Sequence, residues 1–499
     1  MNMLRTLDLG VLPRSVVSAG GTEWGLARTS AGPRLVGAAP TGPAVFQRFE
    51  GDVSDAAGAR VFVGPLSAAN AAALRAALPW LVASALGSRT SAGLGDRLGL
   101  ATPGHVQAMR AAGGAVAPIF AQQSIREMAR TGRTPRQVMD DAMWGVFEEG
   151  WQDGFGSDAD HLKQPHEIDA CAAAGFTLFT IDPGEHVDRA AESMSAPDLA
   201  ASVEALPWDL LEDSYAALGS RFLGRRFDLD GLAVEFDPHV LAKAAVKYGR
   251  AVAHVAAMFR HLERAASGRP FELEVSVDET DEPTSHAEHV YVAMELKRLG
   301  VRWVSLAPRF VGRFEKGVDY IGDLGTFERH YAGHAAIARA LGPYKISLHS
   351  GSDKFSVYPI AATHSRGLIH LKTAGTSYLE AIRTVAALDP PLFRELYELA
   401  RERYEADRAS YHVSAELGRA PDAGRVPDAE LDAIIDQFDA RQVLHVTFGS
   451  VLTACGSDGR PVFAGRLRGL LARHPDAYAR NLARHLARHV QPFAASARA

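Results

Sequence analysis

Three histidines stand inside or at the end of short apolar runs of this sequence. They are His161 in SDADHLK, His349 in ISLHSG and His370 in LIHLKT. Neutral imidazole nitrogens are good ligands for a borderline divalent ion, and catalytic metal sites often use three protein ligands and leave one position open. The three histidines therefore predict a metal site. The alternative for each of them is a hydrogen-bonded histidine in the core.

Acidic side chains occur at the same points of the sequence, namely Asp158, Asp160, Asp182, Glu274, Asp278 and Glu279. A carboxylate inside a protein core is costly unless it is paired, bound to a metal or catalytic. In FELEV, Glu274 alternates with apolar neighbours, which places it on a buried face. Glu272 has the same parity, so one of these two glutamates could instead be a partner in a buried ion pair.

Basic side chains follow the same runs, namely Lys163, Lys354, Lys372, Arg97 and Arg309. Several cations beside a metal site suit an anionic substrate such as a carboxylate or a phosphate. The loops HSGSDKF and TAGTS add backbone N–H groups, and TAGTS leads into a helix whose N-terminus attracts anions. The alternative for each lysine is a surface position on a loop.

These side chains require a scaffold that brings strand ends together. From about residue 86, short apolar or glycine-bounded runs alternate with longer amphipathic stretches. The runs are 91–101, 115–123, 155–163, 176–184, 271–279, 302–310, 344–351 and 367–373. This alternation predicts βαβ units and a parallel sheet. Eight units favour a closed, TIM-like (β/α)8 barrel, with working residues at the C-terminal strand ends, over a doubly wound open sheet.

The rest of the chain surrounds this barrel, which we assign to residues 86–390. Residues 1–85 are rich in Gly and Ala and predict a small α/β or mostly irregular N-terminal layer. A largely helical stretch at about 186–270 predicts an insertion that covers the site. Residues 391–499 predict a C-terminal helical appendage.

Composition excludes several classes of protein. The 499 residues carry a net charge of -6, which does not fit a nucleic-acid binder. The two cysteines, Cys171 and Cys455, are far apart and in apolar settings, so we expect small buried hydrophobes rather than a disulfide. The sequence has neither a secretory signal nor an apolar run of about 18 residues. We therefore expect a cytoplasmic protein that does not contact membranes.

Several motifs are missing or incomplete. GLGDRLG at 93–99 has the wrong spacing for a dinucleotide fingerprint, so no nicotinamide cofactor is expected. The chain contains neither GxxxxGK[ST] nor GxSxG, which disfavours kinases and α/β-hydrolases. The pairs His330/His334 and His485/His489 are four residues apart but lack the glutamate of HExxH, so we expect exposed helix faces there.

Two long segments, KISLHSGSDKFSVYP and HLKTAGTSYLEAIR, resemble the tagaturonate epimerase family. So do GLGDRLGLATPGH, FAQQSIREM, FGSDADHLK and SLAPRFVGRFEKGVDYIGD, and together these segments extend over about 93–385. The resemblance implies a barrel enzyme that needs a divalent metal (Zn, Mn, Ni or Co). It also implies interconversion of D-tagaturonate and D-fructuronate by inversion at C4 in hexuronate breakdown.

The resemblance also implies roles for particular residues. His161 and His349 are expected to bind the metal, and Asp160 and Glu274 to form an acid–base pair. Since these two acids lie on different strands, we expect the barrel to place them on opposite sides of the site, as inversion requires. His370 is our choice of third ligand on chemical grounds, with Glu279 and Glu315 as alternatives. The residues expected to bind the sugar acid are Arg97, Gln122, Arg309, Lys354 and Lys372.

The position of C4 in the substrate limits the mechanisms that are possible. C4 of a 2-keto hexuronate is not adjacent to the ketone, so its hydrogen is not acidic. A metal that holds an enediolate and a carboxylate that takes the C4 hydroxyl proton suit retro-aldol cleavage and re-addition. The same residues would serve a metal-dependent aldolase or sugar isomerase, and an inert sugar-acid-binding barrel is a further alternative. The expected partner is a small sugar acid, in a protein that could form a homo-oligomer.

Overall fold

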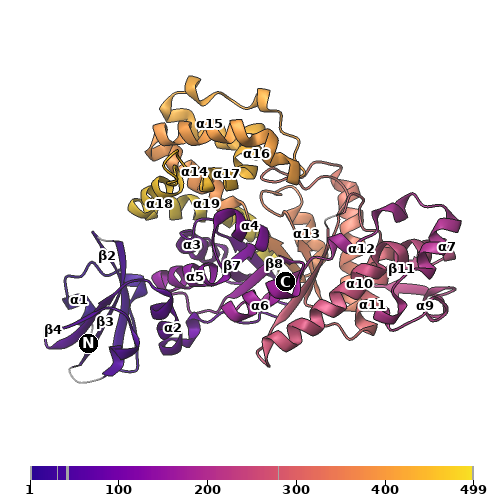
Figure 1. The fold of residues 1–499 in the computed structure, drawn as a ribbon, viewed down its shortest axis with the longest axis horizontal. Helices are drawn as coiled ribbons and strands as arrows, with labels where there is room; N and C mark the ends of the chain where they lie inside the picture. The colour runs from indigo at the N-terminus through magenta and orange to yellow at the C-terminus, as the bar shows by residue number, and fades with distance from the viewer. Residues whose placement is uncertain (1–2, 31, 41–43, 279, 497–499) are drawn as a thin grey trace.

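Eight parallel strands form a closed barrel at the centre of the molecule (Figure 1). The computed structural model describes residues 3–30, 32–40, 44–278 and 280–496. In chain order the barrel strands are β6 (Ser91–Gly95), β7 (Ala117–Ser124), β8 (Gly156–Leu162), β9 (Leu178–Ile181), β12 (Glu272–Val277), β13 (Ser305–Pro308), β14 (Lys345–Leu348) and β15 (Ile369–Lys372). Each of the eight runs expected from the sequence overlaps one of these strands. The pairing of β9 with β12 closes the sheet, so the barrel is confirmed and the open sheet is wrong.

Helices surround the barrel between successive strands. They are α3 (Thr102–Ala112), α4 (Ile125–Thr131), α5 (Pro135–Glu149), α6 (Pro165–Ala174), α10 (Pro238–Ala266), α11 (His286–Arg298), α12 (Leu324–Leu341), α13 (Tyr358–Ser365) and α14 (Thr376–Leu388). Local sequence sets their ends, as α5 illustrates. Thr134 and Gln137 form a capping box at its start, and Gly150 ends it with a φ of 59°, a conformation that glycine adopts without a steric penalty.

An antiparallel sheet precedes the barrel. Its strands are β1 (Val17–Ala19), β2 (Thr22–Thr29), β3 (Gly32–Pro40), β4 (Asp52–Ala56) and β5 (Ala59–Gly64), in the order β1–β2–β3–β5–β4, and helix α2 (Ala68–Ala77) follows. The core of this sheet is aromatic, because the rings of Trp24, Phe46 and Phe62 pack against one another. The N-terminal layer is therefore an ordered sheet and not an irregular region. The residues of its core lie far apart in the sequence.

The stretch at 186–270 contains two different parts. The first holds α7 (Ala196–Glu204), α8 (Trp208–Leu211), α9 (Tyr215–Phe222) and a hairpin of β10 (Arg226–Leu229) and β11 (Leu232–Glu235), which lie at the right of Figure 1. The second is α10, which packs against α6 and α11. Helix α10 is therefore one of the barrel's own outer helices, and only the part before it is inserted.

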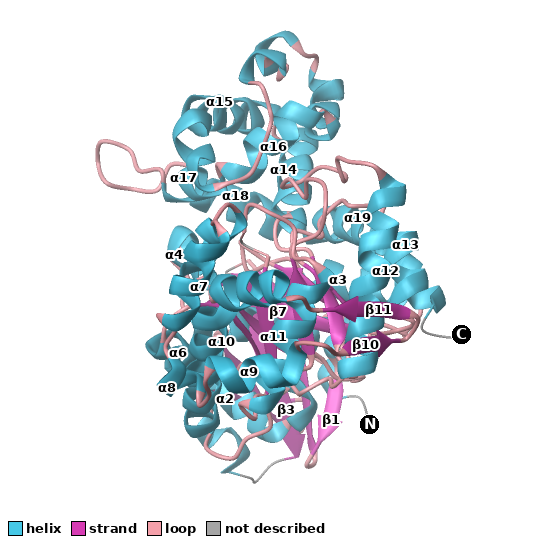
Figure 2. Cartoon of the chain, turned by 90° about the vertical axis from the view of Figure 1, so that its right-hand side faces the viewer, coloured by secondary structure: helices cyan, strands magenta, loops and turns pink. Residues whose placement is uncertain are grey.

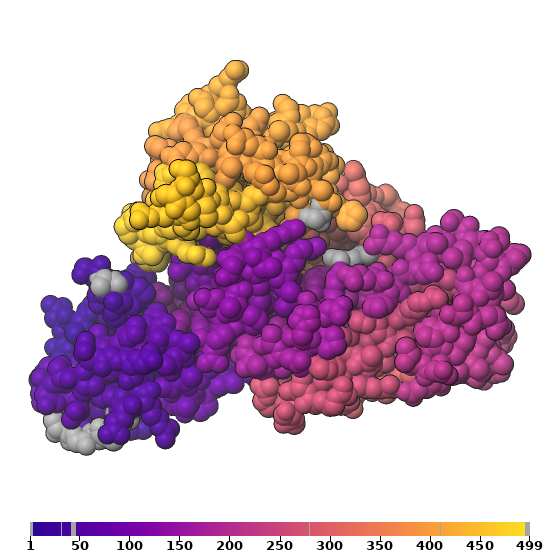
Figure 3. Space-filling view, in the orientation of Figure 1, coloured from indigo at the N-terminus to yellow at the C-terminus, as the bar shows by residue number. Residues whose placement is uncertain are grey.

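The C-terminal region forms a helical lobe above the barrel (Figures 2 and 3). It comprises α15 (Pro390–Asp407), α16 (Phe438–Val446), α17 (Phe448–Thr453), α18 (Ala464–Arg473) and α19 (Pro475–Ser496). Helix α19 returns to pack against α3, α13 and α14. Tyr411 and His445 of this region line the pocket at the barrel mouth, whereas the insertion contributes only Arg189 among the described residues that line it. The C-terminal region therefore supplies more of the described lining than 186–270 does, and the expectation that 186–270 covers the site stays a prediction.

Burial corrects three smaller expectations. Cys171 is buried, but Cys455 is exposed, and both thiols are free. His334 and His489 are fully buried and His485 is 9% exposed, so these histidine pairs do not form exposed helix faces. Helices α11 and α13 pack against α12, and α3, α13 and α14 pack against α19, which their sequences alone do not reveal. Within the described residues, no helix combines the length and the apolar character that a membrane span needs.

Candidate active site

Lys372, the last residue of β15, lies at the centre of a charged cluster inside the barrel. Its Nζ is 2.6 Å from Asp160 Oδ1, 2.9 Å from Asp158 Oδ2 and 2.7 Å from Glu274 Oε1. It also donates to Thr180 Oγ1 at 2.7 Å. Burial disfavours the ammonium ion, but the three carboxylates raise the pKa of Lys372 well above its usual value. Lys372 is therefore a permanent cation that draws three acids together.

Asp160 and Glu274 converge on Lys372 from the same side of the barrel. Strand β9 is the only strand between β8, which carries Asp160, and β12, which carries Glu274. The expectation that they lie on opposite sides is therefore wrong, because only one strand separates them. Burial opposes ionisation of both groups, yet Lys372 and a neighbouring histidine hold the pKa of each carboxyl below its usual range. Both carboxyl groups are therefore ionised, the form that a proton acceptor requires.

Gln122 and Asp158 lie beside Asp160 and Glu274 but have different roles. Gln122, expected to bind substrate, donates from Nε2 to Asp160 Oδ2 at 3.1 Å and so orients Asp160. It is fully buried and is not among the described residues that line the mouth. Burial raises the pKa of Asp158 to about 6, although Lys372 counteracts this shift. Glu272 does not join the cluster, because its carboxylate accepts a hydrogen bond from the backbone N–H of Gly87.

His161 and His349 face each other across the mouth, with ring centroids 5.1 Å apart. His349 Nε2 is 2.6 Å from Glu274 Oε1, and its Nδ1 is 3.2 Å from Asp278 Oδ1. His161 Nδ1 is 3.3 Å from Asp182 Oδ2. Burial disfavours protonation, but Asp278 and Glu274 raise the pKa of His349 to about 10. Each imidazole is thus oriented by a carboxylate, as metal-binding histidines usually are.

The backbone at His161 is strained. Its φ is 54°, a left-handed conformation that non-glycine residues rarely adopt, and the pairing of β8 with β9 is irregular between Ala159 and Leu162. Such conformations cost about 1–3 kcal/mol and cluster at functional positions. The strain turns the His161 side chain into the mouth pocket.

His370 lies one layer deeper than Lys372 on the same face of β15. It is fully buried, its Nδ1 is 2.9 Å from Ser91 Oγ, and burial lowers its pKa to about 3. It is not among the described residues that line the mouth. Of the two alternatives, Glu279 lies outside the described residues, and Glu315 Oε2 accepts hydrogen bonds from Ser414 and Gln442. The structure therefore brings His161 and His349 together without His370.

Two adjoining pockets open at the mouth, and His161 lines both. The inner pocket has a volume of about 570 Å³, part of it open to solvent, and its lining includes Arg97, Asp160, His161, His349 and Lys372. The outer pocket has a volume of about 1170 Å³, also partly open to solvent, and carries the basic side chains of Arg126, Arg189, Arg309, Arg313 and Lys316. An anionic substrate would meet a basic entrance and then the charged cluster.

The cations expected to bind substrate do not all reach these pockets. Lys372 and Arg97 line the inner pocket, and Arg309 lines the outer one. Arg97 is also paired with Glu127 at 2.7 Å. Lys354 is wrong as a substrate-binding residue, because its fully buried Nζ donates to three backbone carbonyl oxygens, those of Glu315, Val318 and Ser352. Lys354 therefore links the loop after β13 to the loop after β14.

Sequence reasoning missed several residues at the mouth. Arg313 and Lys316 lie in the segment that also holds Arg309, so their basic character was a usable signal. Tyr411 and His445 come from the C-terminal region, which carries no motif that points to the barrel. Only the packing of this region over the strand ends reveals them.

Comparison with known proteins gives a consistent result. The model of the tagaturonate epimerase family matches residues 32–493. The tagaturonate/fructuronate epimerase of Thermotoga maritima is 45% identical over 421 residues, which cover 84% of each chain. Crystal structures of the fructuronate-tagaturonate epimerase UxaE from Cohnella laeviribosi, native and complexed with glycerol, superpose with a TM-score of 0.92 at 37% identity. They cover 98% of this chain.

Proposed function

Because the chain belongs to the tagaturonate epimerase family, we propose that this isomerase interconverts D-tagaturonate and D-fructuronate by inversion at C4. One observation of the site carries the proposal. Two ionised carboxylates, Asp160 and Glu274, lie within 2.7 Å of the Lys372 ammonium group at the end of a barrel. The arrangement offers two proton acceptors and one fixed positive charge to a single substrate oxygen.

The charges of the buried cluster at the strand ends fit a divalent cation. Among the described residues of the cluster, carboxylates outnumber ammonium groups: Asp158, Asp160, Asp182, Glu274 and Asp278 face Lys163 and Lys372. The raised pKa of His349 has the same origin, since a proton there offsets the surplus negative charge. A metal ion would offset it as well.

We assign His161 and His349 as ligands of this ion, which is Zn, Mn, Ni or Co. Since His370 lies a layer deeper, Asp278 is the better third ligand, because it lines the outer pocket together with His161. When bound, such an ion stabilises negative charge on substrate oxygens as a Lewis acid. His370→Gln should then retain metal, and Asp278→Asn should lose it.

Retro-aldol chemistry follows from the position of the ketone. The C4 hydroxyl group is β to the C2 carbonyl, so loss of its proton allows the C3–C4 bond to break, which leaves an enediolate and an aldehyde. Asp160 or Glu274 accepts the hydroxyl proton. The positive charge of Lys372 stabilises the C4 oxyanion, the aldehyde turns its other face to C3, and return of the proton to the C4 oxygen completes the inverted product.

The experiment is to incubate the purified protein with D-tagaturonate in D2O, with and without a chelator, and to follow the products by NMR. We expect D-fructuronate with no deuterium at C4, because the C4 hydrogen travels with the aldehyde. Deuterium at C4 would contradict the retro-aldol step, and release of separated fragments would favour an aldolase instead. Absence of any conversion would overturn the proposed function.

A further inference from the structure

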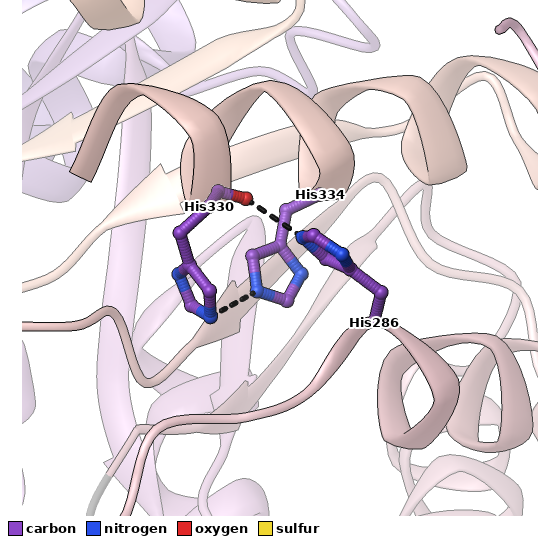
Figure 4. Close-up of side chains that lie close together, drawn as sticks. All are labelled: His286, His330 and His334. Carbon is purple, nitrogen blue, oxygen red and sulfur yellow. Dashed lines mark hydrogen bonds between the residues drawn. The ribbon is translucent and has the colours of Figure 1, made fainter. Parts of the chain in front are cut away.

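A second group of histidines lies outside the barrel mouth, between two outer helices (Figure 4). His286 is the first residue of α11, and His330 and His334 are one turn apart on α12. One ring nitrogen from each lies within 4.8 Å of the other two. His334 is fully buried, while His286 and His330 are half-buried, so solvent can reach the group.

The spacing of two nitrogens fits ligands better than a hydrogen bond. His330 Nε2 and His334 Nε2 are 3.4 Å apart. Good hydrogen bonds between nitrogen and an acceptor are shorter, about 2.7–3.2 Å. Two nitrogens that each lie about 2.0–2.1 Å from a tetrahedral zinc ion are about 3.4 Å apart. The pair therefore already has the separation of two metal ligands.

The neighbours of His334 orient its Nε2 atom. His334 Nδ1 is 2.8 Å from His289 Nδ1, and His289 Nε2 is 2.8 Å from the hydroxyl of Tyr344. When His334 donates from Nδ1, its Nε2 presents a lone pair to His330 and His286. Metal-binding histidines usually donate their second nitrogen to such a partner, which fixes the ring and its tautomer.

Gly333 makes room for the third ring. A Cβ atom at this position would lie 2.2 Å from His286 Nε2. Glycine inside a helix is less favourable than alanine, so its presence here calls for a packing reason. The reason is the imidazole of His286, which rests against α12 and donates to the carbonyl oxygen of His330 at 3.0 Å.

All three donors are imidazoles, and burial disfavours protonation of two of them, His330 and His334. Burial lowers the pKa of His330 to about 4, with His286 adding to the shift. Burial also holds the pKa of His334 well below its usual value. An all-imidazole donor set favours zinc, cobalt, nickel or copper over magnesium or calcium, which prefer oxygen ligands.

We propose that His286, His330 and His334 bind one divalent transition ion of the zinc type, at a site separate from the barrel mouth. The ion would join the start of α11 to α12. The ion would lie beside the loop before α11, where it would replace the hydrogen bond from His330 Nε2 to Thr284 O at 3.1 Å.

The test uses the full chain with the two substitutions H161A and H349A. Metal bound at the barrel mouth then does not contribute to the measured number of ions per chain. Apoprotein of this double variant is titrated with Co²⁺ and followed by the visible spectrum, by elemental analysis and by Tm. We expect one equivalent of Co²⁺ with tetrahedral d–d bands, and a Tm that rises with Co²⁺ or Zn²⁺ but not with Mg²⁺.

Three further variants in this background locate the ion. H286Q and H330Q should abolish the bands and the Tm rise. G333A should do the same while keeping all three histidines, because its new methyl group displaces the ring of His286. H364Q is the matched control, since His364 is a half-buried histidine on neighbouring α13 that pairs with Glu328. It should bind Co²⁺ like the parent.

Two results would overturn the proposal. One is the absence of stoichiometric Co²⁺ binding in the double variant. The other is binding that persists in H286Q, in H330Q and in G333A, which would place the ion at another group such as Asp353, His485 and His489. Either result is independent of epimerase activity, so failure of the proposed function does not affect this test.

Discussion

Two buried charged clusters lie within one loop of each other and differ in how their charges are paired. The first is the mouth cluster around Lys372. The second, here called the clamp, consists of Asp353, Lys354, Arg441, His485 and His489 and joins the loop after β14 to the C-terminal helices. In the clamp, Asp353 pairs with Arg441 at 2.9 Å and with His485 at 2.5 Å.

Every charge of the clamp has its partners, whereas the mouth keeps a surplus. Lys354 donates to three carbonyl oxygens, and His489 Nε2 accepts from the N–H of Asp353 at 2.9 Å. At the mouth, Glu274 Oε2 is buried without a hydrogen-bond partner among the described residues. Buried polar groups are normally satisfied, so burial of charge alone does not mark an active site. The feature that distinguishes the mouth cluster is a carboxylate oxygen left without a hydrogen-bond partner.

The largest effect should follow from removal of the metal that we assign to the mouth. Treatment with a chelator, or substitution of His161 or His349 by alanine, should abolish turnover. Activity should return to the chelated wild-type enzyme on addition of Zn, Mn, Ni or Co. Elemental analysis checks the metal content of each variant. Full activity of metal-free protein would show that the surplus negative charge has another role.

The next effect concerns the carboxylates beside Lys372. Asp160→Asn and Glu274→Gln should each lower kcat by about a hundredfold or more, the usual scale for general acid–base groups. Fold and metal content should stay unchanged, since neither side chain is assigned as a ligand. Steady-state kinetics with matched metal analysis provides the measurement. Near-normal turnover in either variant would remove that residue from the mechanism.

A smaller effect should appear when the substrate loses its charge. The outer pocket carries Arg309, Arg313 and Lys316, so we expect it to hold the C6 carboxylate. Tagatose lacks this group, and a lost charge-assisted hydrogen bond costs roughly 1.5–3 kcal/mol, or about ten- to a hundredfold in kcat/KM. Equal kcat/KM for tagatose and tagaturonate would show that the basic entrance does not recognise the acid.

The smallest effect on turnover should come from the clamp. Lys354→Met leaves three buried carbonyl oxygens without their donor, each worth about 1–3 kcal/mol when unsatisfied. The Tm should fall, while kcat/KM of the folded variant changes by less than about threefold. Thermal unfolding and kinetics on the same sample check both statements. A large loss of kcat at unchanged Tm would place Lys354 in the chemistry and remove the contrast.

The barrel could be predicted because its signals are local. Each strand is a short apolar run next to a helix with its own caps, and eight such units have few alternatives to closure. His161 and His349 could be predicted for the same reason, since their place at a strand end is visible in the sequence. The N-terminal sheet left no such pattern, because Trp24, Phe46 and Phe62 form its core only after the chain folds.

The sequence by itself determined the order of strands and helices and the residue types at the strand ends. It could not distinguish Lys354 from Lys372, because both lie at or after the end of a strand, and the structure buries both. Only the tertiary structure decided that three carboxylates surround one lysine and three carbonyl oxygens the other. The physical reason is that the charge balance of a buried group depends on partners from distant strands and helices, which no local pattern specifies.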